Sequence, residues 1–91
     1  MEQQDKGLLK PGKEREAITL SALTPGQAGE IAFVRTNEPE QLQKLTALGI
    51  LPGVPISLQQ NFPAYVFRIH RTQFAVDKEI AGSIFVSLIS Q

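Results

Sequence analysis

The stretch LGILPGV, residues 48–54, decides the fold of this 91-residue chain because it ends one element and begins another. Gly49 stands where a helix needs a left-handed residue after its last turn, which predicts a Schellman stop. Pro52 and Gly53 suit the two central positions of a type II turn, in which glycine supplies the positive φ. A strand can then begin at Val54. We therefore assign Gly49, Pro52 and Gly53 a structural role in this corner.

Upstream of the corner, the sequence predicts one helix over about residues 38–48. Asn37, with Glu40 three residues later, matches a capping box at its start. Leucines recur at three-residue spacing and should share one helix face: Leu42, Leu45 and Leu48.

Short apolar or alternating segments on both sides of this helix predict strands. One runs over residues 28–35, and four follow the corner as a meander: PISLQQNF, AYVFRIH, TQFAVD and GSIFVSLI. Asp77 can cap a short helical turn near residues 78–82. The side chains of Tyr65, Phe67 and Ile69 share one strand face and should belong to the core. The sequence thus predicts a mainly β protein, a small barrel of five to six strands with one inserted helix.

Pro55 carries information about the sheet because proline cannot donate a ladder hydrogen bond. It should therefore lie on an edge strand or at the first residue of a strand. Such an edge could be free or paired with a second copy, so a weak homo-oligomer stays open.

Composition narrows the domain organisation and the function class. Nine basic and nine acidic residues cancel, which argues against non-specific binding to nucleic acid or to an anionic membrane. Residues 1–17 are rich in charge and poor in apolar surface, so we predict a flexible tail followed by one domain over residues 18–91. The chain shows neither a signal peptide nor a run of about 18 apolar residues, so we expect a cytoplasmic protein that does not insert into the membrane.

Chemistry-bearing residues are sparse. With one histidine, no cysteine and no phosphate-binding glycine motif, we expect no catalytic residues, no enzyme activity and no cofactor. His70 lies beside Arg68 and Arg71, whose charge opposes a divalent cation, and Asp77 and Glu79 fit a solvated turn. We therefore expect no metal site.

The same arginines could form a nucleic-acid surface together with aromatic residues. Tyr65 and Phe67, however, project to the opposite strand face from Arg68 and His70, which argues against nucleic acid as a partner.

Protein binding is the function class that remains. Ile84 and Val86 should point inward, so Phe85 should point outward. Turn geometry should also expose part of the corner. The hypothesis for a partner-binding surface therefore includes Leu51, Pro52, Phe62 and Phe85, on the condition that they lie together.

The phrases LTPGQAGEI, LQKLTALGILPGVPISL and RTQFAVDKEIAGSIFV resemble the FeoA family over residues 18–88. FeoA proteins are small cytosolic proteins of bacterial ferrous iron uptake, related to the SH3-like C-terminal domain of DtxR-class repressors. The resemblance implies an SH3-like barrel and a non-enzymatic accessory that binds the FeoB permease and modulates its assembly or activity. The alternative is a metal-responsive regulatory module that associates with a transcriptional repressor.

Two departures from the family pattern stand out. Many members begin the helix with arginines, whereas Glu38 and Glu40 lie there in this chain and Lys44 is the one cation of the helix segment. The loop NFPA is also shorter than the glycine-rich connection of other members.

Overall fold

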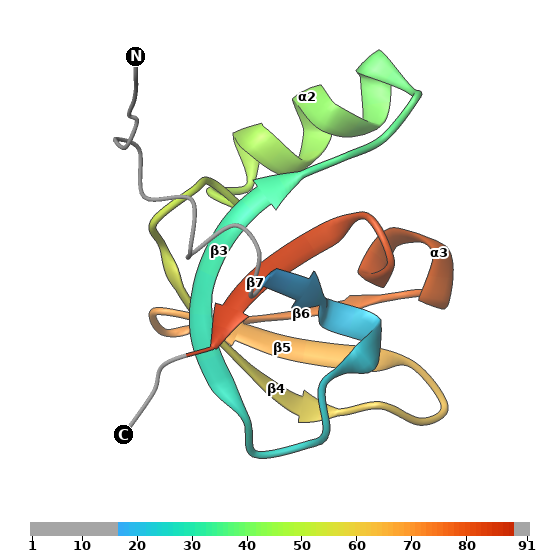
Figure 1. Ribbon diagram of the computed structural model, residues 1–91. Helices are drawn as coiled ribbons and strands as arrows, with labels where there is room; N and C mark the ends of the chain where they lie inside the picture. Colours follow the sequence, from blue (N-terminus) through green and yellow to red (C-terminus); the bar gives the residue numbers. More distant parts are fainter. Residues whose placement is uncertain (1–16, 89–91) are drawn as a thin grey trace, which may run out of the picture.

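The computed structural model describes residues 17–88, and within them six strands form one antiparallel sheet in the order β2-β7-β3-β4-β5-β6 (Figure 1). The strands are β2 (Ala17–Thr19), β3 (Ala28–Val34), β4 (Pro55–Gln60), β5 (Tyr65–Ile69), β6 (Thr72–Val76) and β7 (Ile84–Leu88). Three helical elements connect them: η1 (Leu20–Ala22), α2 (Pro39–Ala47) and α3 (Lys78–Ala81). The mainly β architecture with one inserted helix is confirmed. The predicted tail lies outside the described residues apart from Ala17, which already belongs to β2.

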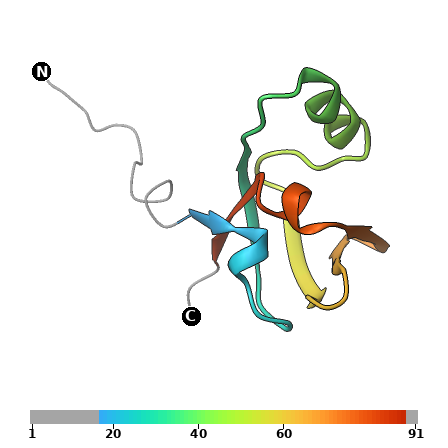
Figure 2. The ribbon, with the colours of Figure 1, turned by 90° about the vertical axis from the view of Figure 1, so that its right-hand side faces the viewer.

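The sheet curls around a single apolar core, so that β2 and β6 lie on opposite sides of the molecule (Figure 2). Side chains with no exposed surface reach it from η1, β4, β5 and β7, among them Leu20, Leu58, Phe67, Ile84 and Val86. Of the three predicted core residues in β5, Phe67 and Ile69 are buried, while Tyr65 packs against the core from its rim. Alternation along β5 was therefore a reliable guide to burial.

Helix α2 begins differently from the prediction. Its N-cap is Glu38, which makes no side-chain cap bond, so the capping box at Asn37 is wrong. The Glu38 N–H donates to Thr36 Oγ1 at 3.2 Å, and Pro39 has no N–H that needs a partner at this position. The helix keeps its first turn without the predicted cap.

The helix also buries a narrower face than its leucine spacing suggests. Leu45 is 2% exposed, whereas Leu42 and Leu48 are 42% and 48% exposed. Residues three apart on a helix are rotated by about 60° from one another. A nine-residue helix that rests on the core along one line therefore buries the middle leucine and leaves its neighbours at the rim.

The corner after α2 has the predicted geometry. Gly49 has a φ of +93°, its N–H donates to the Thr46 carbonyl, and the Ile50 N–H donates to the Leu45 carbonyl at 3.0 Å, which completes a Schellman stop. Gly53 has a φ of +89°, and the turn closes with the Val54 N–H donating to the Leu51 carbonyl at 3.2 Å.

Pro55 is the first residue of β4, as predicted, but β4 lies between β3 and β5 and is not an edge. The hypothesis that the strand beginning at Pro55 forms an edge that could pair with a second copy is therefore wrong. Among the described strands, the two edges are β2 and β6. Asp77 caps α3 as predicted, because its Oδ1 accepts the Ile80 N–H at 2.9 Å.

Candidate interaction surface

A β-bulge in β3 brings an aromatic side chain to the outer face of the sheet. Ile31 lies opposite Val86, but Phe33 lies opposite Phe85, so Ala32 is an extra residue in β3. Strict alternation would place Ile31 and Phe33 on the same face. The bulge leaves Ile31 in the core, 1% exposed, and turns Phe33 to the outside beside Phe85.

Phe33, Phe85 and Arg35 form a cluster on this outer face, which we call the aromatic–arginine cluster. The two rings stack with centroids 4.6 Å apart and planes 18° apart. The Arg35 guanidinium carbon lies 5.2 Å from the Phe33 centroid and 5.8 Å from the Phe85 centroid. The Arg35 backbone N–H donates to the Ser83 carbonyl at 2.8 Å, which ties the end of β3 to the start of β7.

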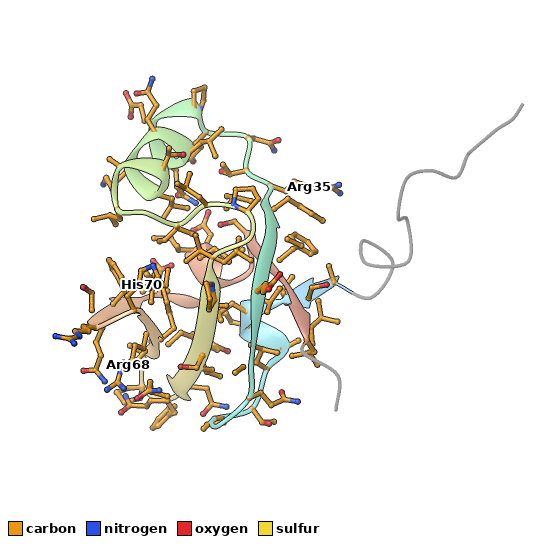
Figure 3. The ribbon with its side chains drawn as sticks, turned by 90° about the vertical axis from the view of Figure 1, so that its left-hand side faces the viewer. Arg35, Arg68 and His70 are labelled. Carbon is orange, nitrogen blue, oxygen red and sulfur yellow. The ribbon has the colours of Figure 1, made fainter. Side chains whose placement is uncertain are left out.

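The cluster combines apolar area with an accessible charge. Both phenylalanines are half-buried and Arg35 is exposed at the end of β3, where its side chain points away from the body of the protein (Figure 3). A stacked aromatic pair adds about 0.5–1.5 kcal/mol, and an exposed cation–π contact about 0.5–1 kcal/mol, so the side chains are held in place before any partner binds. Aromatic residues and arginine are also the types that most often dominate protein interfaces.

The predicted residues Leu51 and Pro52 border the same part of β3. Their turn is joined to Ile31 by two backbone bonds, from the Ile31 N–H to the Val54 carbonyl at 2.9 Å and from the Gly53 N–H to the Ile31 carbonyl at 2.7 Å. Both residues are exposed, Leu51 by 41%. β3 therefore carries the corner along one side and Phe85 along the other.

Phe62 does not join them. It lies just after β4, whereas Leu51 lies just before it, and the ends of a six-residue strand are roughly 17 Å apart. Phe62 is 81% exposed and lines a separate hollow of about 400 Å³ together with Tyr65, Val76 and Asp77. The four predicted residues therefore divide into two places.

Phe33 and Arg35 are the members of the surface that sequence reasoning missed. A bulge leaves no reliable mark in a single sequence, because any two adjacent strand residues can accommodate it. The pair of phenylalanines on neighbouring strands was the available signal, since aromatic residues often pair across strands.

Polar and charged residues elsewhere in residues 17–88 bear on the metal and nucleic-acid sites that the sequence raised. Within residues 17–88 there is no group of three or more His, Cys, Asp or Glu side chains that could hold a metal ion. His70 lies in the β5–β6 turn, and with Arg68 it borders a hollow of about 280 Å³ on the outer face (Figure 3). No helix in the described part of the chain is both long and apolar enough to cross a membrane.

Comparison with solved structures shows the same architecture in two groups of proteins. A crystal structure of an iron uptake regulatory protein, FeoA, matches 80% of this chain and 99% of its own length, with 25% identity and a TM-score of 0.72. The zinc complex of Stenotrophomonas maltophilia FeoA, a prokaryotic SH3-domain protein, matches 80% of this chain and 96% of its own, with 21% identity and a TM-score of 0.71. A manganese-dependent transcriptional repressor matches 80% of this chain but 42% of its own, with 20% identity and a TM-score of 0.73.

A search of curated proteins gave no match. The family model for the FeoA domain matches residues 18–88, which include almost all of the described fold. The SH3-like architecture that the resemblance implied is therefore confirmed. The chain belongs to the FeoA family, the small SH3-like accessory domains of ferrous iron transport.

Proposed function

We propose that this protein is a non-enzymatic, cytoplasmic accessory of ferrous iron uptake that binds the cytosolic side of the FeoB permease and modulates its assembly or activity. Membership of the FeoA family supports the pathway, and the aromatic–arginine cluster is the observation that carries the binding role.

The cluster suits this task because it is already ordered. Binding costs free energy when flexible side chains must be fixed, and each such side chain costs about 0.5–1.5 kcal/mol. Phe33 and Phe85 hold each other by stacking, and Arg35 rests against both rings. A partner that covers this face gains contact area while it orders few new groups.

The neighbouring corner extends the apolar part of the surface. Leu51 is 41% exposed in a turn that two backbone bonds hold against β3. These bonds fix the backbone of the turn to that of the strand. We place the docking surface across β3, with Phe85 at one border and Leu51 at the other.

Co-purification with detergent-solubilised FeoB tests the proposal. The wild-type chain should be retained, Phe85→Asp and Leu51→Asp should be lost, and Arg35→Ala should be weakened. Phe62→Asp is the matched control. Phe62 is more exposed than Phe85 or Leu51, and it lies beyond the end of β4 that is far from Leu51. A thermal melt of each variant confirms that it is folded. Equal retention of Phe85→Asp, Leu51→Asp and wild type would show that this surface does not dock.

The alternative function, a metal-responsive module bound to a repressor, makes a different prediction. The likeness to the manganese-dependent repressor concerns the fold, since the identity is 20%. If the alternative holds, the chain will associate with a DNA-binding protein only when metal is added, and solubilised FeoB will not retain it.

A further inference from the structure

The edge strand β6 is open for pairing. Of the described strands it is hydrogen-bonded to β5 alone, in a regular register from Tyr65 opposite Val76 to Ile69 opposite Thr72. Natural edges are usually protected by lysine, proline or a bulge, and within the described residues β6 has none of these. The other edge, β2, is three residues long and lies on the opposite side of the molecule (Figure 2).

The hairpin register shows which backbone groups of β6 are unused. A two-residue turn, His70 and Arg71, joins β5 to β6, so Ile69 and Thr72 form a hydrogen-bonded pair. Such pairs alternate, so Phe74 and Val76 also bond to β5. The N–H and C=O groups of Gln73 and Ala75 therefore point away from the sheet, and both residues are exposed.

We propose that β6 pairs antiparallel with β6 of a second copy, around a two-fold axis at Phe74. This register places Gln73 opposite Ala75 of the second copy, and by symmetry Ala75 opposite Gln73. Gln73 and Ala75 each point a backbone N–H and a C=O outward. Each opposed pair therefore forms two backbone hydrogen bonds, and the two pairs form four. The result is a continuous sheet across two molecules.

Charge complementarity selects a second copy as the occupant. Continued by one residue beyond each end of β6, the same register places Arg71 opposite Asp77 of the second copy, and the contact occurs twice because of the symmetry. Both side chains are exposed. Asp77 accepts the Ile80 N–H through Oδ1, so its Oδ2 can accept from the guanidinium.

The hollow beside Asp77 provides the space that this contact needs. It measures about 400 Å³ and is lined by Phe62, Tyr65, Val76 and Asp77. The Phe62 ring, 81% exposed, offers a face to an arginine that enters the hollow. The dimer therefore also accounts for the most exposed aromatic side chain of the described fold.

Apolar contact completes the interface. Phe74 stacks on Phe67, with centroids 5.3 Å apart, yet Phe74 and Val76 are only half-buried at the rim of the core. Around the two-fold axis the two copies of Phe74 form a non-hydrogen-bonded pair with Cα atoms about 4.5 Å apart. One five-residue strand from each copy makes a small interface, so we expect a weak dimer with a dissociation constant in the micromolar to millimolar range.

Sedimentation equilibrium of the full chain, from micromolar to millimolar concentration, tests this proposal. The wild type should shift from monomer to dimer. Ala75→Pro should remain monomeric with little change in melting temperature, because its N–H points outward and proline is tolerated at that position of an edge strand. Arg71→Glu should raise the dissociation constant about tenfold or more, since it places like charges opposite each other twice.

Lys44→Glu is the charge-matched control on α2 and should dimerise like the wild type. A wild type that is monomeric at millimolar concentration would overturn the proposal. A dimer that survives both Ala75→Pro and Arg71→Glu would also overturn it, and Arg71→Glu alone decides if the proline variant does not fold. Permease binding by the β3 surface is measured separately and does not depend on this result.

Discussion

Gly29 is the position at which a single methyl group should cost most, because β7 packs closely against it. The residue is buried in β3, opposite Leu88 of β7 and Ile56 of β4. A Cβ atom built there would lie 2.8 Å from Val86 Cγ1 and still closer to the Ser87 carbonyl oxygen. The valine methyl can move a little, but the carbonyl belongs to the sheet backbone.

The expected loss of stability follows from this contact. Overpacking typically costs about 1–3 kcal/mol, and a clash with backbone belongs at the upper end of that range. A core of this size supplies only about 3–5 kcal/mol of net stability. Gly29→Ala should therefore remove half or more of it. With a urea slope of about 1 kcal/mol/M, the unfolding midpoint should fall by roughly 2–3 M.

Gly82→Ala is the matched control for this experiment. Gly82 has a φ of −75°, and a Cβ there meets the Lys78 carbonyl oxygen at 3.4 Å, an ordinary contact. The variant should be neutral or stabilised by up to about 1 kcal/mol, because alanine restricts the unfolded chain. Urea unfolding followed by circular dichroism measures both variants. An ordinary surface substitution changes the free energy of unfolding by up to about 0.5 kcal/mol. If the free energy of unfolding of Gly29→Ala differs from that of the wild type by no more than this amount, the close approach does not constrain the fold.

Substitutions at three further positions address local geometry. His70 has a φ of +56°, so His70→Gly should raise the free energy of unfolding by about 1 kcal/mol in the same urea assay, and a loss would show that the histidine side chain stabilises the turn. Gly49→Ala should lower the free energy of unfolding by about 1–2 kcal/mol, because alanine is strained at the backbone φ of +93°. The added Cβ meets nothing within 4 Å, so a steric clash does not contribute. An unchanged urea midpoint would show that the backbone conformation carries no such cost. Asp77→Ala should cost about 1 kcal/mol through loss of the α3 cap, while Asp77→Asn should keep most of the stability in a thermal melt, and equal losses would point to the charge instead.

The parts of the candidate surface differ in how far sequence could predict them. Phe85 was expected to point outward because its neighbours alternate, and it does so while half-buried by Phe33. Leu51 was expected to be exposed because turn geometry leaves little room inside a corner. Phe62 was grouped with them, but the length of β4 separates it from Leu51. To decide which exposed residues lie together, the distances between strands are needed, and residue type alone does not predict them.

Local interactions let the sequence alone determine the corner after α2 and the cap of α3, because each depends on residues within about one turn of one another. Tertiary pairing decided the rest: the bulge that turns Phe33 outward, the interior place of Pro55 and the edge at β6. The physical reason is that strand register is a property of two segments at once. If one strand shifts by one residue relative to its neighbour, the side chains that faced the core face solvent instead. The sequence of either strand alone does not reveal such a shift.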